Sequence, residues 1–577
     1  MRYINLLVTF FLWSCKENAP VDFTTPYEVS GKKQTATYGE VIDFYQKLSE
    51  AHNNIKLITM GHSDVGKPMH LVLFSSNGNF DPEYFHNHNL PVWLINNGIH
   101  PGESCGIDAS MLFLRSLAQT EFSFTKEFLI AAIPVYNIGG ALNRNKTTRA
   151  NQVGPEAYGF RGNAKNYDLN RDFIKMDTRN AAAFVQIFQY LNPDLFLDTH
   201  TSDGADFQHV MTLLATQPDK MGEPMASYFR EVISPYLYKK MEVRGYPMTP
   251  YVQTIKSTPE QGISGFFDSP RYSTGYTTLF QTLGFMSEAH MLKSYEERVD
   301  ATYQLMQVFL EVLQSNGVKI KEKRLATLKN WQQLDSYPVQ WELSQNKKSS
   351  IKFLGYGIDT IVGKATGFPR PHFNHQKPLQ QAVDFYEYYH PTKSIDVPDG
   401  YIVPQAWQEV IKRLKMNLVQ MEQFSKDTII AVNYYQLDSF KTYPSPYEGH
   451  YPHYKVTLSE NAKTRKFING DYYVSTQQPA FRLILETLEP AATDAYFNWN
   501  FFDAILSRKE YFSSYIFEAK AADFLASHPN IRASFEKRKQ TDQDFANDPG
   551  AQLRFIYEQS PYFEQSYLQY PVCRVVN

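Results

Sequence analysis

The stretch PVWLINNGIHPGESCGIDASMLFLRSLA, residues 91–118, decides the fold of the N-terminal half. It opens with the short apolar run PVWLI, which is typical of a buried strand. It closes with CGIDASMLFLRSLA, whose apolar side chains recur every three or four residues and predict an amphipathic helix. A Pro-Gly turn joins the two and carries His100 and Glu103, residue types that a surface turn does not need.

Alternating helices and strands extend from this stretch in both directions. Helices are expected at 38–52, 179–192 and 294–315, a strand pair at 55–76, and single strands at 128–137 and 193–200. Strands that alternate with helices and are apolar on both faces indicate a layered α/β domain. We therefore predict a mixed, mostly parallel sheet flanked by helices, within a domain that covers residues 36–320.

The N-terminus predicts export. Residues 1–15 contain one Arg, an apolar run of about a dozen residues and then Cys15, which are the proportions of a secretory signal. LWSC, residues 12–15, resembles the bacterial lipobox, so we expect Cys15 to be lipidated and to anchor the chain at the bacterial cell envelope. A simple cleaved signal with an incidental Cys is the alternative. Residues 16–35 are polar and without periodicity, which predicts a tether.

The sequence pattern changes near residue 321. Short alternating runs separated by turn signals, such as those at 349–358, 393–404 and 428–437, predict β-rich structure. The last hundred residues look more helical. Residues 321–577 are therefore predicted to form a C-terminal accessory region that is β-rich and then helical.

Length, charge and cysteine content exclude several classes of protein. A chain of 577 residues is too long for one ordinary core, so two or three domains are expected. A net charge of -3 argues against a nucleic-acid partner, which usually requires a basic face. Three cysteines are too few for a disulfide framework, and whether Cys105 and Cys573 pair stays open.

Two histidines stand where predicted strands end. His100 follows the strand in residues 91–95, and His200 ends the strand at 193–200. Ligand groups in open α/β sheets gather at the carboxyl ends of strands. With Glu103 the histidines make a His2Glu set, which can hold Zn2+ and leave a fourth position for water. The spacing alone is weak, so structural or surface roles for these histidines stay open.

Further polar residues lie between and after the histidines. Asn170 and Arg171 form a pair that could hold a carboxylate through forked hydrogen bonds, although a solvated loop with a surface ion pair is the alternative. Arg161 lies in the same stretch. Glu288 follows an apolar run, where an isolated carboxylate is costly unless it is paired or functional.

Taken in order, four motifs resemble the M14 family of zinc carboxypeptidases. They are HPGE at 100–103, DLNRD at 168–172, DTH at 198–200 and SEAH at 287–290. The resemblance covers roughly residues 36–315. It implies a carboxypeptidase-type fold and zinc-dependent hydrolysis of a peptide bond by a metal-activated water, most often releasing the C-terminal amino acid.

The resemblance also implies a role for each matched residue. One Zn2+ would be bound by His100, Glu103 and His200, and Glu288 would act as the general base. Arg161 would stabilise the oxyanion, and Asn170 with Arg171 would bind the terminal carboxylate of the substrate. Asp198 would either orient a ligand or cap its strand.

The sequence departs from the family pattern in its loops. The spacings around His200 differ, and NIGG at 137–140 replaces the frequent N-P-D-G. The family's substrate-capping Tyr has only Tyr272 and Tyr276 as candidates. A peptidoglycan stem peptide as substrate, or a non-catalytic binding protein, therefore stays an alternative to a peptide-cleaving enzyme. Contact with a membrane is expected only through the lipid anchor.

Overall fold

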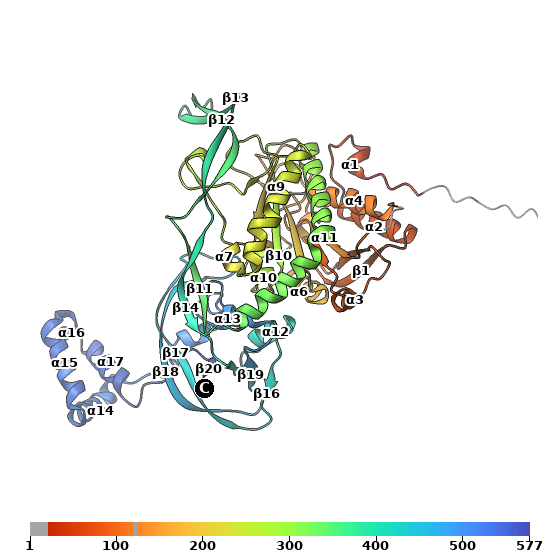
Figure 1. Cartoon of the computed structure of the whole chain (residues 1–577). Coiled ribbons are helices and arrows are strands. Elements are labelled where there is room, and N and C mark those ends of the chain that lie inside the picture. Colours follow the sequence, from red (N-terminus) through yellow and green to blue (C-terminus); the bar gives the residue numbers. More distant parts are fainter. Residues whose placement is uncertain (1–20, 121–123, 577) are drawn as a thin grey trace, which may run out of the picture.

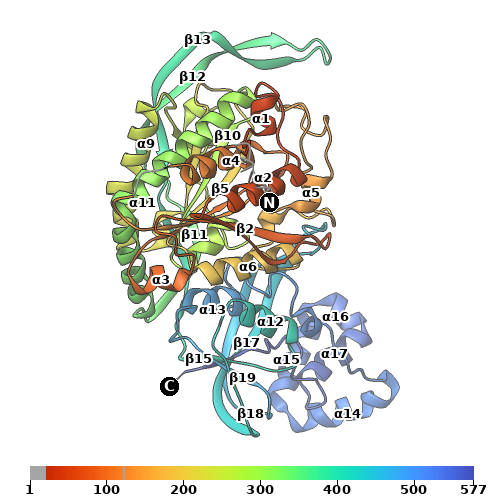
Figure 2. The same ribbon diagram turned by 90° about the vertical axis from the view of Figure 1, so that its right-hand side faces the viewer.

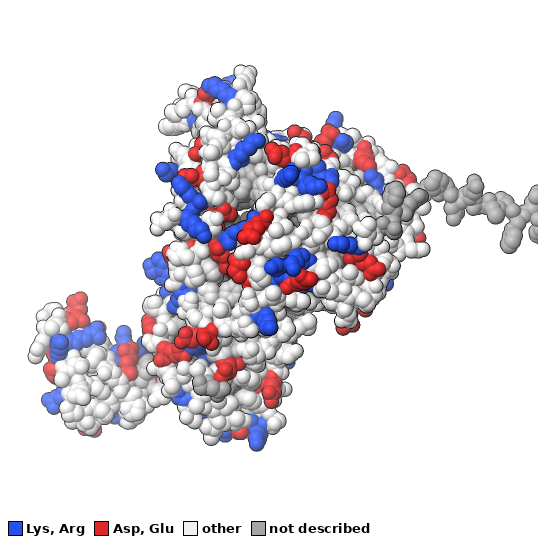
Figure 3. Space-filling model, viewed as in Figure 1, with Lys and Arg blue, Asp and Glu red and all other residues white. Residues whose placement is uncertain are grey.

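The computed structural model describes residues 21–120 and 124–576 (Figure 1). The predicted signal and Cys15 lie outside these residues, so export and lipidation stay predictions. Within the described ranges, none of the helices combines the length and the apolar character needed to cross a bilayer. On the face seen in Figure 3, acidic and basic side chains are interspersed.

An eight-stranded mixed sheet forms the centre of the N-terminal part. Its strands are β1 (Ile55–His62), β2 (Pro68–Ser75), β3 (Val92–Asn96), β4 (Leu129–Ile133), β5 (Leu195–Ser202), β6 (Met211–Ala215), β7 (Thr249–Pro250) and β10 (Leu283–His290). They are arranged in the order β1-β2-β4-β3-β5-β10-β6-β7. The central strands β4, β3, β5 and β10 run parallel, and antiparallel pairs flank them. The predicted mixed, mostly parallel sheet is confirmed.

Helices cover both faces of this sheet. One face packs against α2 (Tyr38–Ala51), α4 (Cys105–Ala118), α9 (Ser234–Val243) and α11 (Tyr295–Gln332), and the other against α6 (Arg179–Leu191) and α10 (Ser273–Thr278). The strands alternate between the two cores: Trp93 and Ile95 of β3 enter the first, Val92 and Leu94 the second. A strand buried on both faces explains the continuous apolar run at 91–95.

The second half of the chain is built mainly from strands. They are β11 (Ser336–Leu343), β12 (Ser349–Val362), β13 (Pro369–Tyr386), β14 (Tyr389–Asp396), β15 (Gly400–Val403), β16 (Glu422–Gln423), β17 (Thr428–Thr442), β18 (His453–Phe467), β19 (Tyr472–Ser475) and β20 (Cys573–Val575). Two helices, α12 (Gln408–Met416) and α13 (Phe481–Leu488), accompany them. Four more follow, namely α14 (Ser514–Ser527), α15 (Pro529–Thr541), α16 (Gln543–Asn547) and α17 (Pro549–Gln559). The β-rich and then helical composition agrees with the prediction.

One hydrophobic core extends through both halves. The core on the α6 face continues into the second half, where it includes Ile411, Phe481 and Trp499. Figure 2 shows α6 lying beside α12 and α13 along this boundary. By contrast, the β12–β13 ribbon and the α14–α17 group project away from the rest of the molecule (Figure 1). The part of residues 321–577 that packs on the α/β part is therefore joined to it by a shared interior.

The shorter elements lie mostly in the connections. They are α1 (Pro26–Val29), α3 (Pro82–Asn87), α5 (Ile138–Leu142), α7 (Pro218–Met221), α8 (Met225–Tyr228), β8 (Gln253–Thr254) and β9 (Ile263–Ser264). The β13 strand pairs with β9, so a strand of the second half joins a sheet with a segment of the first. The two described cysteines, Cys105 and Cys573, are both buried free thiols.

The structure differs from the predicted tether at residues 16–35. Its described portion, from residue 21 on, includes α1, which begins with a capping box between Thr25 and Glu28. Glu28 also pairs with Arg115 of α4 at 2.7 Å. Polar residues that cap a short helix and pair with a neighbour read as a tether in the sequence, because neither role leaves a periodic apolar pattern.

The structure also differs from the predicted boundary at residue 320. The helix α11 runs through it to Gln332, and Lys321 and Arg324 are buried in its continuation. Both pair with Asp194, which precedes β5. Buried Lys and Arg side chains make this part of the helix as polar in sequence as an exposed segment. The drop in apolar residues near residue 320 therefore does not mark a domain boundary, because the same helix continues and packs against other residues.

Candidate active site

Three neighbouring strands bring the predicted residues to one edge of the sheet. His100 follows β3, His200 lies in β5 and Glu288 in β10, and β5 stands between the other two. The parallel pairing of β5 with β10 places His200 opposite Glu288. Carboxyl ends of parallel strands meet at one edge, which is where α/β proteins form their sites.

The Pro-Gly turn directs His100 and Glu103 to the same point. The Glu103 N–H donates to the His100 carbonyl at 2.7 Å, and α4 begins two residues later at Cys105. The turn is closely packed at Gly102, where a Cβ would lie 2.7 Å from Cδ of Arg149 and 3.0 Å from the Gly159 carbonyl oxygen. Residues 91–118 are thus a strand, a turn that carries two potential ligands, and a helix.

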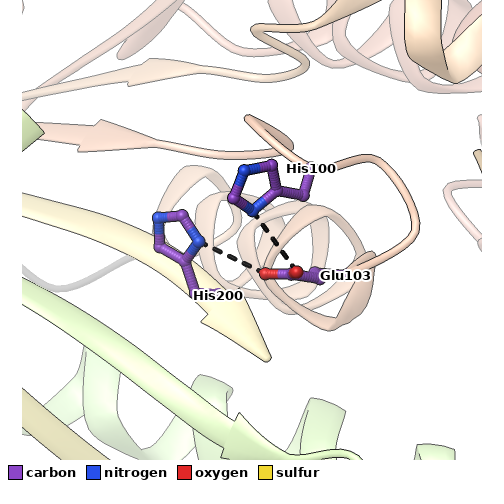
Figure 4. A group of neighbouring side chains, drawn as sticks. All are labelled: His100, Glu103 and His200. Atoms are coloured by element: carbon purple, nitrogen blue, oxygen red, sulfur yellow. Dashed lines mark hydrogen bonds and ion pairs between the residues drawn. The ribbon is translucent and has the colours of Figure 1, made fainter. Parts of the chain in front are cut away.

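His100, Glu103 and His200 form a compact cluster (Figure 4). Each offers one ligand atom, and these atoms all lie within 4.8 Å of one another. Nδ1 of His100 is 3.3 Å from Oε1 of Glu103, and Nδ1 of His200 is 3.2 Å from Oε2. All three side chains are buried. The predicted ligand set therefore converges, although its residues span 101 positions of the sequence.

The orientation of both imidazoles fits a metal site. Nε2 of His100 lies 2.8 Å from Oδ1 of Asp168, and Nε2 of His200 lies 3.0 Å from Oδ2 of Asp198. Since a carboxylate only accepts, the contact with Asp168 favours a proton on Nε2 of His100 and a lone pair on its Nδ1, which faces Glu103. Both ring nitrogens of His200 face carboxylates, Nδ1 that of Glu103 and Nε2 that of Asp198.

A cation is needed to balance this arrangement. An unprotonated nitrogen that faces a carboxylate is repelled by it unless a positive charge lies between the two. Among the described residues, none hydrogen-bonds Nδ1 of His100. Two imidazole nitrogens and one carboxylate are the donor set that catalytic zinc sites use, so the residues present fit zinc.

The pKa shifts in the cluster point the same way. Burial alone would raise the pKa of Glu103, but His100 and Arg149 outweigh burial and hold it well below its usual range. Burial alone would lower the pKa of His200, but Asp198 outweighs burial and raises it well above its usual value. The carboxylates around His200 thus favour a positive charge at this point of the cluster.

Asp168 connects the three residues His100, Glu103 and His200, named the metal cluster because their donor atoms suit a metal ion, to Arg161. Its Oδ1 faces His100, and its Oδ2 accepts hydrogen bonds from Nε and one Nη of Arg161 at 3.1 and 2.8 Å. Burial would raise the pKa of Asp168, but His100 and then Arg161 lower it far below its usual value. Arg161 also reaches Oε1 of Glu103 at 3.4 Å, so the structure places it beside the cluster.

Asn170 and Arg171 lie in the same cavity as the cluster. The Ser273 N–H donates to Oδ1 of Asn170 at 3.1 Å, which leaves the amide nitrogen of Asn170 to act as a donor. The guanidinium of Arg171 stacks 4.6 Å from the centre of the Tyr272 ring. Both predicted carboxylate-binding residues are therefore held in fixed orientations beside the metal cluster.

Glu288 lines this cavity as predicted. Burial raises the pKa of Glu288 to about 8, with the nearby carboxylates of Glu103 and Asp198 adding to the effect of burial. A raised pKa places the proton exchange of Glu288 close to neutral pH. This is the range in which general bases are most effective.

Several contributing residues were missed by the sequence reasoning. Arg149 donates to Oε1 of Glu103 at 3.1 Å and lines the cavity, yet in the sequence it is one of several cations in a polar loop. Asp168 belongs to the DLNRD motif, but nothing in its spacing showed that it holds His100. Ser273 donates its hydroxyl to Oδ2 of Asp198 at 2.6 Å and leaves no sequence signal of that contact. Asp198 lies against His200, with its Oδ2 3.0 Å from Nε2 of the imidazole, which favours the orienting role over that of a cap.

The two candidate tyrosines separate clearly. Tyr272 lines the cavity, whereas Tyr276 is fully buried and donates its hydroxyl to Asn417 at 2.6 Å. Tyr276 is therefore a core residue. The remaining aromatic side chains of the cavity are Tyr251 and Phe266.

The candidate site occupies a cavity of about 360 Å³. A larger cavity of about 720 Å³ adjoins it and shares Leu214, Tyr251 and Phe266 with it. The larger cavity contains none of the predicted ligands, so the chemistry belongs to the smaller one.

Comparison with known proteins agrees with this site. Residues 41–303 match the family model of zinc carboxypeptidases, and all of the predicted site residues except Cys15 fall within that range. This part of the chain is similar in sequence to zinc carboxypeptidases. The family match and the fold support a peptide hydrolase.

Individual relatives of the chain are distant. Carboxypeptidase 2 from Trichophyton tonsurans is 21% identical over 437 residues, covering 71% of this chain and 73% of the fungal protein. Carboxypeptidase 2 from Trichophyton equinum has the same identity and coverage.

Solved structures of similar proteins include two metallocarboxypeptidases. A metallo-carboxypeptidase from Pseudomonas aeruginosa is 14% identical with a TM-score of 0.35, covering 47% of this chain and 68% of its own. Carboxypeptidase A from Helicoverpa armigera is 14% identical with a TM-score of 0.35, and the match covers 48% of this chain and 74% of the insect protein's chain.

Proposed function

We propose that this protein is a zinc-dependent carboxypeptidase, which hydrolyses the last peptide bond of its substrate and releases the C-terminal amino acid. The observation that carries this proposal is the shared cavity. Asn170 and Arg171, which suit a terminal carboxylate, line the same cavity as His100, Glu103 and His200, which suit a metal.

The metal cluster and the general base supply the hydrolytic chemistry. Zinc bound by His100, Glu103 and His200 would act as a Lewis acid and lower the pKa of a water ligand to about 7. Glu288 accepts a proton from the attacking water and returns it to the departing amine. A positive charge near Glu288 favours its ionised form, which suits the first of these roles.

Two arginines supply positive charge for the oxyanion. Arg161 commits Nε and one Nη to Asp168, so its position is fixed by a forked hydrogen bond. Arg149 is held by Gln152, which accepts from its Nε at 2.7 Å. Both reach Oε1 of Glu103, so both can stabilise negative charge that develops beside the cluster.

The carboxylate pair sets the position of the cut. A forked guanidinium and an amide can bind both oxygens of a terminal carboxylate, which places the last peptide bond of the substrate over the metal cluster. An internal residue of a peptide has no free backbone carboxylate for this pair to bind. This geometry favours release of single C-terminal residues over internal cleavage.

The test of this proposal is Glu288→Gln. We expect the variant to keep its zinc and to lose at least about 10²-fold in the release of C-terminal residues from N-blocked dipeptides, because an amide cannot take up the proton. Zinc content is measured on the same samples. Glu296→Gln, at an exposed position of α11, serves as the matched control. Near-normal turnover of the Glu288 variant would refute the role assigned to it.

A further inference from the structure

We propose that the C-terminal region completes the active site, and that Glu448 is a positioning residue for the carboxylate that orients the metal ligand His100. This inference rests on the proposed function and assigns a role to the second half of the chain. The loop at 443–452 and residues near Asp494 contact the two segments that carry the site's polar residues.

The first contact reaches the metal cluster through Asp168. Oε2 of Glu448 accepts a hydrogen bond from the backbone N–H of Asp168 at 2.8 Å, across 280 positions of the sequence. The side chain of Asp168 in turn faces Nε2 of His100 and binds Arg161. Glu448 therefore fixes the backbone from which the ligand-orienting carboxylate projects.

The backbone around Glu448 is shaped for this approach. Glu448 has a φ of +49°, a conformation that a residue with a side chain rarely adopts without a compensating contact. The next residue, Gly449, has a φ of +79°, and a Cβ there would lie 2.5 Å from the hydroxyl oxygen of Tyr167. The two segments thus also touch closely beside the Glu448–Asp168 hydrogen bond, at Gly449 and Tyr167.

The second contact reaches the carboxylate-binding pair. Asp494 is buried and accepts three hydrogen bonds from Arg271: from its backbone N–H at 3.0 Å, from Nε at 2.8 Å and from Nη2 at 2.5 Å. Two residues further on, Ser273 donates to Asn170 and Asp198. Asp494 therefore holds the segment that orients one substrate-binding residue and one ligand-orienting carboxylate.

Between these contacts, buried charges join the two halves. Lys175 is fully buried and pairs with Asp172 and Asp177, each at 2.8 Å. From the C-terminal region, His450 and Arg413 contact Asp177 at 2.7 and 3.0 Å. A buried charge is stabilised by well-placed partners, so the contacts from His450 and Arg413 stabilise the segment that follows Asn170 and Arg171.

Precise support of this kind is what a metal site requires. Residues that orient metal ligands through hydrogen bonds commonly change metal affinity or activity 10–100-fold when they are removed. Glu448 acts one residue further from the metal than Asp168 does, so we expect an effect near the lower end. A C-terminal region that only bound another protein would show no such coupling.

The experiment compares Glu448→Ala and Glu448→Gln in the full-length protein. We expect Glu448→Ala to weaken zinc binding about tenfold, measured by competition with a chelator, and to lower kcat/KM by a similar factor. Glu448→Gln should stay within about threefold of wild type, because its amide oxygen can still accept from Asp168. The melting temperature of the zinc-free protein should change little in either variant.

A matched control separates positioning from general stability. Gln332→Ala removes a hydrogen bond between the end of α11 and the strand-rich region, from Nε2 of Gln332 to the Gln478 carbonyl at 2.9 Å, away from the site loops. It should leave zinc affinity unchanged. Should Glu448→Ala fail to fold, Gly449→Ala disturbs the same contact through Tyr167 and should weaken zinc binding as well.

Three results would overturn the inference. The first is unchanged zinc affinity in Glu448→Ala, whatever happens to its melting temperature. The second is an equal loss in Glu448→Gln, and the third is an equal loss in the Gln332 control. If wild-type protein binds zinc but cleaves no peptide, the proposed function fails, and the zinc affinities of the variants still decide the positioning role.

Discussion

Replacing Arg171 by Met should remove the enzyme's ability to recognise a free terminal carboxylate. Met is close to Arg in length and can still pack on Tyr272, but it has neither the charge nor the forked donors. The Arg171 side chain is only 21% exposed, and its guanidinium is oriented by the Asn170 carbonyl at 2.9 Å and by the Tyr272 ring. The substrate carboxylate would therefore meet a partly desolvated and preorganised partner.

The size of the effect follows from the strength of such a contact. Hydrogen bonds to charged groups contribute about 1.5–3 kcal/mol. At about 1.4 kcal/mol for each factor of ten, kcat/KM on a substrate with a free carboxylate should fall roughly 10- to 150-fold. Activity on the corresponding dipeptide amide should change little, because that substrate cannot form the ion pair.

The assay measures kcat/KM of wild type and variant on an N-blocked dipeptide and on its C-terminal amide. The ratio of the two values isolates the carboxylate interaction from any general loss of activity. Arg171→Lys keeps the charge without the planar fork and should lie between the other two proteins. An equal fall on both substrates, or a wild type that does not distinguish them, would refute the assignment of Arg171.

Two further predictions concern packing next to the site and in the cavity that adjoins it. Gly106→Ala would place a Cβ 2.0 Å from Oγ1 of Thr199, which precedes His200. Thermal melts should show that this variant loses about 1–3 kcal/mol of stability. Gly39→Ala, with open space around the new Cβ, should lose none. Burial lowers the pKa of His209 from 6.5 to about 4, so the stability from keeping it neutral is present above pH 6.5 and is lost as pH falls toward 4, by up to about 3 kcal/mol. In His209→Gln, the free energy of unfolding from urea melts should differ less between pH 7 and pH 5 than in wild type. The Leu354 amide, which donates to His209, should exchange its hydrogen faster in the variant. A variant with the wild-type pH dependence would contradict this.

The parts of the fold set by local pattern could be predicted from the sequence. The helix at 105–118 and the strands around it follow from apolar periodicity, which depends on neighbouring residues alone. The ligand histidines could be proposed because each ends a recognisable strand. Their convergence could be expected from the rule that parallel strands share one functional edge.

The parts set by distant contacts could not be predicted in this way. Arg149 and Asp168 contact the metal cluster from loops whose polar composition is typical of any solvated surface. Glu448 lies 280 positions from its partner, and a Glu in a Tyr- and Pro-rich loop carries no local sign of such a contact. The continuous α11 helix was divided at residue 320 because its buried cations Lys321 and Arg324 resemble exposed ones in a sequence.

The most direct test of the central claim is the zinc content of the purified, folded protein. Two imidazole nitrogens and one carboxylate within 4.8 Å of one another should hold one zinc ion per chain after loading and dialysis. The same measurement on His200→Ala should find the zinc largely lost while the chain stays folded. Wild-type protein that is folded yet retains no zinc, or a His200 variant that retains all of it, would contradict the account.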